Sequence, residues 1–395
     1  MAHRGETCGK NLIREDLQNY KPAPNLVLNE KIRQLESEGK KIYHFAFGQS
    51  PFPVMDKARL ELSRHAGEKA YLPVAGLLPL RKAICSFHKE LDGLENLDPE
   101  NVIVGPGSKE LLFLVETVFQ GDIFLMHPTW ITYAPQARLA RHKPIIIRTK
   151  FEDDWRVTPG LLEETFQKSC NNETGHLFVL CYPDNPTGTS YTAEQLKALV
   201  VVFRKYNTTV VTDEIYGRLT FEGNHESLAK YYPEGTILST GLSKWAGAGG
   251  WRLGYHIYPS TLKQLYTAVL SAASHTYSCA SAPIQYAALS YLNLSDESRS
   301  YMDHTRRILA AVAEYCYKKF ATVGIKVVRP KGGFYMYPDF EVIREALLKR
   351  GVGSCQAMCD ALFQEAAIAV MPWDTEFKGG ERFTVRFCYN NNKLY

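Results

Sequence analysis

The residues with the clearest chemical potential lie in a glycine-rich stretch in the second half of the chain. Lys244 stands within L-S-T-G-L-S-K-W-A-G-A-G-G-W-R-L-G-Y, a segment with little other charge. A lysine in such surroundings is a candidate for the lowered pKa that makes its amine nucleophilic. Arg252 follows eight residues later and can return to the same pocket, where a guanidinium would clamp a phosphate.

A second candidate is the loop G-P-G-S at 105–108, which joins an apolar run to a stretch with helical spacing. Free backbone amides at a helix start suit a phosphate, and glycine allows a close approach. The loop matches neither the dinucleotide fingerprint nor the G-x-x-x-x-G-K-[ST] nucleotide loop. An ordinary strand-to-helix turn therefore stays open as an alternative to a phosphate site.

Two further loops carry polar side chains. Asp213-Glu214-Ile215-Tyr216 follows the apolar run 209–212, and a carboxylate in that position is costly unless a cation meets it. Tyr216 shares the face of Asp213 if the loop makes a helical turn. The loop Y-P-D-N-P-T-G at 182–188 holds two prolines, an Asn and a Gly, and a rigid turn is sufficient to explain it.

These loops follow short, β-branched apolar runs that are typical of buried strands. Stretches with helical spacing, such as 108–120, 159–169 and 192–206, separate most of them. The alternation predicts an α/β fold with a mostly parallel sheet covered by helices on both faces, and ligands gather at the carboxyl ends of such strands. The predicted strands are 101–104, 123–126, 144–148, 177–182, 209–212, 236–239 and 254–258.

After about residue 296 the pattern changes to α+β. A long helical segment at 296–320 precedes short strand-like runs, with another helix near 353–366. This change predicts a second, smaller domain. The runs lie at 325–329, 333–337, 368–371 and 383–387.

Composition narrows the class of protein. The 395 residues are 45% hydrophobic and 22% charged, which excludes a disordered chain, and a net charge of +4 is too small to indicate nucleic-acid binding. The nine cysteines lack zinc-like spacing, so we expect reduced thiols and no metal. No signal peptide and no run of eighteen apolar residues is evident, so we expect a soluble, cytoplasmic protein without a membrane partner.

Three motifs in this order, N-P-T-G, D-E-I-Y and S-K followed by G-W-R-L-G-Y, resemble the aspartate-aminotransferase-like family. These are class I/II, fold-type-I enzymes that use pyridoxal 5′-phosphate (PLP). F-G-Q-S-P-F, Y-L-P-V-A-G-L-L-P-L-R, H-P-T-W, G-G-F-Y and F-T-V-R-F extend the resemblance over nearly the whole chain. It implies a seven-stranded central sheet in a large PLP-binding domain at 46–295, and a smaller α+β domain built from 1–45 and 296–395.

The resemblance implies roles around the cofactor ring. Lys244 is similar to the lysine that forms the Schiff base and shuttles the proton, and Asp213 to the carboxylate that pairs with the pyridinium nitrogen and keeps the ring an electron sink. Tyr216 and Asn185 would hydrogen-bond the ring's O3′. Trp130 resembles the aromatic that stacks on the ring, with Tyr133 as the competing aromatic.

The resemblance also implies a phosphate cup. The amides of 107–109, that is Gly107, Ser108 and Lys109, would hold the phosphate together with the Ser243 hydroxyl and Arg252. Tyr71 resembles a tyrosine that reaches the phosphate from the neighbouring subunit, which implies a homodimer.

For the substrate, Arg386 is similar to the family's clamp on the α-carboxylate, with Gly48 and Asn185 beside it. His275 is the one histidine to consider for this pocket, against a plain structural role. The family further suggests a cis peptide bond before Pro186.

The motifs favour an aminotransferase that moves an amino group between an α-amino acid and a 2-oxo acid by a ping-pong mechanism. A lyase of the β-eliminating or cyclopropane-forming type, or a decarboxylase, remains the alternative, because all pass through the same bound cofactor. In one branch of the family a lysine at the position of Lys109 takes the distal carboxylate of acidic substrates, which favours glutamate or aspartate as donor. A surface lysine at a helix start explains Lys109 equally well.

Overall fold

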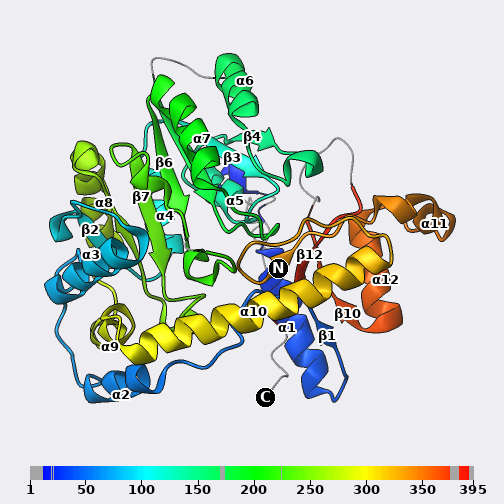
Figure 1. Ribbon diagram of the computed structural model, residues 1–395, viewed down its shortest axis with the longest axis horizontal. Coiled ribbons are helices and arrows are strands. Elements are labelled where there is room, and N and C mark those ends of the chain that lie inside the picture. Colours follow the sequence, from blue (N-terminus) through cyan, green and yellow to red (C-terminus); the bar gives the residue numbers. More distant parts are fainter. Residues whose placement is uncertain are drawn as a thin grey trace, which may run out of the picture.

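The protein is described from a computed structural model that covers residues 12–18, 20, 22–169, 174–223, 225–373 and 382–390. A seven-stranded sheet lies at its centre, with strand order β2-β8-β7-β6-β5-β3-β4 (Figure 1). Only β8 runs against its neighbours. The predicted mostly parallel sheet is therefore confirmed. Its strands are β2 (Val102–Gly105), β3 (Gly121–His127), β4 (Ile145–Arg148), β5 (Gly175–Cys181), β6 (Thr208–Asp213), β7 (Thr236–Gly241) and β8 (Gly254–Ile257).

Helices cover both faces of this sheet, as its apolar sequence requires. Adjacent strand residues point to opposite faces, so Phe178 packs in one hydrophobic core and Val179 in the other. The Phe178 core includes side chains from α6 (Pro159–Ser169) and α7 (Ala193–Lys205), and the Val179 core includes side chains from α4 (Ser108–Val118) and α8 (Lys263–Thr276). The remaining helices of this region are α2 (Asp56–Arg64), α3 (Leu78–Asp92), α5 (Tyr133–Leu139) and α9 (Ala282–Leu292).

Helix α10 (Asp296–Thr322) crosses the molecule and leads to the C-terminal segments (Figure 1). These comprise β9 (Tyr335–Met336), α11 (Arg344–Lys349), α12 (Cys355–Ala366), β10 (Ile368–Ala369), β11 (Met371–Pro372) and β12 (Val385–Cys388). Near the other end of the chain, α1 (Pro24–Ser37) precedes β1 (Tyr43–His44), which pairs in parallel with β10. Segments from both ends of the sequence thus lie together, while the domain boundaries at 46–295, 1–45 and 296–395 stay a prediction.

Two local expectations are wrong. The run 325–329 forms no strand but only an isolated bridge from Lys326 to Asp339, because the chain then turns to a different partner, with the Lys331 N–H bonded to the carbonyl of Gly188. The cis peptide bonds of the described residues precede Pro128 and Pro183, not Pro186. Around Pro186 the turn is closed instead by the Asp184 carboxylate, which accepts hydrogen bonds from the backbone N–H and the hydroxyl of Thr187.

None of the helices in the described ranges is long and apolar enough to cross a membrane.

Candidate active site

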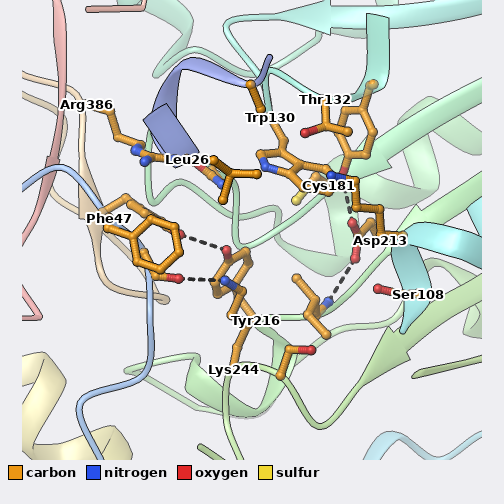
Figure 2. Close-up of a pocket in the computed structure, with 18 of the residues that line it drawn as sticks. Leu26, Phe47, Ser108, Trp130, Thr132, Cys181, Asp213, Tyr216, Lys244 and Arg386 are labelled. Atoms are coloured by element: carbon orange, nitrogen blue, oxygen red, sulfur yellow. Dashed lines mark hydrogen bonds between the residues drawn. The ribbon is translucent and has the colours of Figure 1, made fainter. Parts of the chain in front are cut away.

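The carboxyl ends of three adjacent strands converge on one pocket. Cys181 and Asp213, the last residues of β5 and β6, pair in register, and Asp213 pairs with Ser239 of β7, two residues before that strand ends. The loops that follow these strands therefore leave the sheet at one edge. The cavity at this edge has a volume of about 250 Å³ (Figure 2). It is lined by Ala23, Leu26, Phe47, Gly48, Ser108, Lys109, Trp130, Thr132, Tyr133, Cys181, Asn185, Asp213, Ile215, Tyr216, Ser243, Lys244, Arg252, Tyr335 and Arg386.

Lys244 reaches this cavity from the turn after β7. Its ammonium donates a hydrogen bond to the backbone carbonyl of Gly48 at 2.7 Å. Burial, reinforced by the positive charge of Arg386, lowers the pKa of Lys244 to about 8. The amine is therefore much easier to deprotonate than an ordinary lysine and can act as a nucleophile near neutral pH.

Asp213 is the acidic side chain that lines the cavity. Its Oδ2 accepts a hydrogen bond from the Tyr133 hydroxyl at 2.7 Å, and its Oδ1 accepts one from the backbone N–H of Ile215 at 3.3 Å. Burial nevertheless raises the pKa of Asp213 to about 6. A cationic N–H group placed in the cavity would offset that desolvation and favour the carboxylate.

Tyr216 projects into the same cavity beside Lys244 (Figure 2). Its hydroxyl lies 3.1 Å from the hydroxyl of Tyr335, and the Lys244 ammonium lies 5.7 Å from the centroid of its ring. Burial raises the pKa of Tyr216 well above the usual tyrosine value, so its hydroxyl remains protonated and able to donate.

The loop between β2 and α4 meets Arg252 at one end of the cavity. Arg252 donates to the carbonyl of Pro106 at 3.3 Å. Gly107 has a φ of +98°, and a Cβ there would lie 2.3 Å from Arg252 Nη2, so only glycine fits. With the start of α4 at Ser108, this geometry combines a guanidinium and helix N-terminal amides, the groups that bind a phosphate.

Arg386 enters from β12 on the side opposite Asp213 (Figure 2). Its side chain is buried, with Nη1 donating to Asn185 Oδ1 at 3.2 Å and Nη2 donating to the carbonyl of Ala46 at 2.5 Å. Its Nε has no hydrogen-bond partner among the described residues. A buried guanidinium with donor capacity to spare is suited to a carboxylate ligand.

Comparison with known families agrees with this geometry. The family model described as "Aminotransferase class I and II" matches residues 40–393. The chain belongs to this family. Its members depend on PLP, and this chain is accordingly an aminotransferase of EC 2.6.1 type with the fold-type-I architecture predicted from the motifs.

Individual relatives of this aminotransferase point the same way. It is 30% identical over 375 residues to an aspartate aminotransferase of Bacillus sp. strain YM-2, covering 92% of this chain and 91% of that protein. It is 29% identical to an aspartate/prephenate aminotransferase of Thermus thermophilus, over 85% and 88% of the two chains. The solved structure of the Thermus thermophilus aspartate aminotransferase with maleate superposes with a TM-score of 0.86 at 26% identity, covering 96% and 95%. These matches do not favour the lyase or decarboxylase alternative.

Most residues that the sequence singled out meet in the cavity of the aminotransferase, and Gly107 lies against Arg252 just beside it. Two lie elsewhere. Tyr71 is 89% exposed in this single chain, so its role stays a prediction that needs a second subunit. His275 is exposed near the end of α8 and does not line the cavity. The residues that line it as predicted are Gly48, Ser108, Lys109, Trp130, Asn185, Asp213, Tyr216, Ser243, Lys244, Arg252 and Arg386.

Sequence reasoning missed several lining residues. Tyr133 was considered only as a ring-stacking aromatic, whereas its hydroxyl contacts Asp213 and its ring meets Trp130 edge-on at 5.2 Å. Tyr335 lines the wall between Tyr216 and Arg386. The G-G-F-Y segment pointed to Tyr335 as part of the family pattern, but no spacing in the chain indicates that Tyr133 faces Asp213.

Proposed function

We propose that this aminotransferase binds PLP in the cavity described above, with Lys244 as the residue that holds it covalently. What supports this most directly is the position of Lys244, a largely desolvated amine with a pKa near 8 in the same cavity as the Asp213 carboxylate. Bound PLP supplies an electrophilic carbon for amines and an electron sink for negative charge that develops at the substrate Cα.

The remaining residues fit the other parts of PLP. Asp213 would accept a hydrogen bond from the ring nitrogen and keep it protonated, and a cation there matches the desolvated carboxylate. Tyr216 would donate to O3′, with Asn185 nearby. The phosphate would be held by Arg252 and by the amides of Gly107, Ser108 and Lys109, with hydroxyls from Ser108 and Ser243. Trp130 would stack on the ring face.

In the proposed reaction Lys244 also moves the proton. Once substrate has displaced its amine, Nζ would be placed to accept the proton of the substrate Cα and to return it at C4′ of the cofactor. The lowered pKa of Lys244 supports this role, because a general base works best when its pKa lies near the operating pH.

The proposed substrates are an α-amino acid and a 2-oxo acid, exchanged in a ping-pong cycle. Arg386 would take the α-carboxylate through two parallel hydrogen bonds, beside Asn185 and the backbone of Gly48. With Lys244 and Arg252 assigned to the cofactor, Lys109 is the cation of the cavity that remains besides Arg386, and its ammonium lies 5.4 Å from the Trp130 ring centroid. Two separate cations favour a substrate with two carboxylates, such as aspartate or glutamate.

We further propose a homodimer in which Tyr71 reaches the phosphate site of the neighbouring subunit. Its high exposure in the single chain supports this arrangement, because a large aromatic side chain in water gains from burial against a partner. A cytoplasmic location is proposed as well. Six cysteines in the described ranges are free thiols, as expected in a reducing compartment: Cys85, Cys181, Cys279, Cys316, Cys359 and Cys388.

Absorbance spectroscopy tests the assignment of Lys244. Wild-type protein loaded with PLP should show the visible band of a protein-bound cofactor, and Lys244→Ala should abolish both this band and transamination. Lys197→Ala, an exposed lysine on α7, is the matched control and should retain both. A Lys244→Ala protein that keeps its colour and activity would overturn the proposal.

A single-turnover experiment distinguishes the reaction types. Without a 2-oxo acid acceptor, aspartate or glutamate should yield about one equivalent of 2-oxo acid per subunit and then stop, as a ping-pong mechanism requires. Continuous release of CO2 under the same conditions would instead support the decarboxylase, and continuous release of pyruvate from serine, which carries a leaving group on Cβ, would support the β-eliminating lyase.

A further inference from the structure

Tyr335 lies between Tyr216 and Arg386 in the wall of the cavity and has no role in the scheme above. It lies on β9, directly opposite Cys388 of β12. Arg386 is two residues from Cys388 on the same strand, so it shares a face with Tyr335. The Tyr335 ring centroid lies 5.0 Å from the Arg386 guanidinium carbon, and its hydroxyl lies 3.1 Å from that of Tyr216.

The position of the Tyr335 hydroxyl is sterically fixed. Only 1% of the residue is exposed, and an ideal Cβ on Gly48 would lie 1.7 Å from its oxygen. The hydroxyl therefore occupies space that glycine alone leaves open at position 48. The hydroxyl of Tyr216 is its hydrogen-bond partner within the described ranges.

The hydroxyls of Tyr335 and Tyr216 can form a hydrogen-bonded chain that ends at the proposed cofactor site. When Tyr216 donates its proton to an acceptor in the cavity, its oxygen can still accept from Tyr335. A hydroxyl that accepts a hydrogen bond donates a stronger one, and this effect is larger in a low-dielectric interior. Burial raises the pKa of both tyrosines, so both hydroxyls keep the protons that the chain needs.

We propose that Tyr335 is a positioning residue with two separable effects on the aminotransferase. Its hydroxyl donates to Tyr216 and so strengthens the bond from Tyr216 to O3′ of the cofactor. Its ring packs on Arg386 and holds the guanidinium in place for the substrate carboxylate. The proposal rests on the function proposed above.

Tyr335→Phe isolates the effect of the hydroxyl. A weaker bond to O3′ should raise the pH midpoint of the visible absorbance of the PLP-loaded protein by at most about 0.7 unit, the shift that corresponds to the full loss of one hydrogen bond of about 1 kcal/mol at 1.36 kcal/mol per pKa unit. KM for the amino acid should stay within about twofold, since the ring remains on Arg386.

Tyr337→Phe is the matched control. Tyr337 is also buried, and its hydroxyl contacts Thr384 at 2.7 Å rather than the cavity. This variant loses a buried hydroxyl hydrogen bond in the same segment, so any general loosening should be shared, whereas the pH midpoint should not move.

Tyr335→Met isolates the effect of the ring, because methionine fills a similar space with an adaptable side chain but offers no aromatic face. Relative to Tyr335→Phe, its KM for the amino acid should rise about tenfold, the size expected for loss of a desolvated cation–π contact. Its pH midpoint should match that of Tyr335→Phe.

The outcomes separate this inference from the function on which it rests. If wild-type protein shows no Lys244-dependent visible band, the proposed function fails. If the band is present but Tyr335→Phe leaves its midpoint unchanged, or Tyr337→Phe shifts it equally, the role of the hydroxyl is refuted. Equal KM values for Tyr335→Met and Tyr335→Phe would refute the role of the ring.

Discussion

Tyr133 donates a hydrogen bond from its hydroxyl to Oδ2 of Asp213 at 2.7 Å, although 80 residues separate them in sequence. With Oδ1 bound by the backbone N–H of Ile215, both oxygens of the carboxylate are held. Burial raises the pKa of Tyr133 far above its usual value, so it acts as a fixed donor. Asp213 is thus oriented by Tyr133 while it remains desolvated.

We expect Tyr133→Phe to weaken cofactor binding and catalysis without unfolding the protein. Removing one donor from a buried carboxylate costs about 1.5–3 kcal/mol, equivalent to roughly 10- to 100-fold. The loss should appear in the dissociation constant of PLP and in kcat/KM, measured by absorbance titration and a coupled transamination assay.

Tyr258→Phe is the control for this substitution. Tyr258 is buried in the same core and lies outside the cavity, with its hydroxyl near His256. It should leave PLP affinity within about twofold. If Tyr133→Phe also leaves PLP affinity and kcat/KM within about twofold, the hydrogen bond to Asp213 contributes to neither cofactor binding nor catalysis.

The relation between Tyr133 and Asp213 also shows what the sequence could not predict. Apolar runs located the strands, and loops after those strands located Asp213 and Lys244, because strand order and chain direction place such loops at one edge. The partner of Asp213 depends on the rotamer and tilt of α5, which tertiary packing decides. The predicted strand at 325–329 is absent for a similar reason, because the chain beyond it bonds to Gly188, a contact distant in sequence.

The lowered pKa of Lys244 predicts how the stability of the cofactor-free protein depends on pH. In the unfolded chain Lys244 titrates near 10.5 and in the native state near 8, so between these values the unfolded state binds more protons. The contribution of Lys244 therefore destabilises the native state fully below pH 8 and fades as pH rises towards 10.5.

Urea unfolding of wild type and Lys244→Met across pH 7.5–10.5 measures this contribution, since other titrations cancel in the difference. The excess stability of Lys244→Met should be largest at pH 7.5–8 and shrink as pH rises. A difference that stays constant would mean that the native amine titrates like an exposed lysine.

Glu214 follows Asp213 and holds the 213–216 loop through buried hydrogen bonds. Its Oε1 accepts hydrogen bonds from Tyr182, Thr212 and Ser227, and its Oε2 lies 2.7 Å from Nε2 of His225. Glu214→Gln should lower the free energy of unfolding by about 1–3 kcal/mol, because an amide NH2 in place of one carboxylate oxygen leaves a buried donor without its acceptor. Glu164→Gln, which removes an exposed pair with Lys168, should cost less than about 1 kcal/mol in the same urea titration. Similar costs for both would contradict this assignment.

Gly48→Ala tests the close approach of the backbone to Tyr335. The added Cβ would overlap the Tyr335 hydroxyl, so either the side chain or the 46–48 segment must move. We expect a loss of about 1–3 kcal/mol in stability from overpacking and a fall in kcat/KM, because Lys244 and Arg386 both donate to carbonyls of this segment. Gly67→Ala, where no atom lies within 4 Å of the new Cβ, should change neither. Unchanged kinetics in Gly48→Ala would show that the segment tolerates displacement.

We expect Lys109 to determine whether the aminotransferase prefers acidic substrates. The pKa of Lys109 is lowered by the partial withdrawal of its ammonium from water and by the neighbouring charge of Arg252. A substrate carboxylate beside the ammonium would raise this pKa again and favour the charged form. Lys109→Met should reduce kcat/KM for aspartate by about 10- to 100-fold, the loss of one charge-assisted hydrogen bond, and change that for alanine by less than about twofold. Lys197→Met, on the exposed face of α7, should affect neither substrate. An equal loss of kcat/KM for aspartate and alanine would mean that Lys109 contacts the cofactor phosphate rather than the distal carboxylate of the substrate. A preference for dicarboxylates would then require another cation.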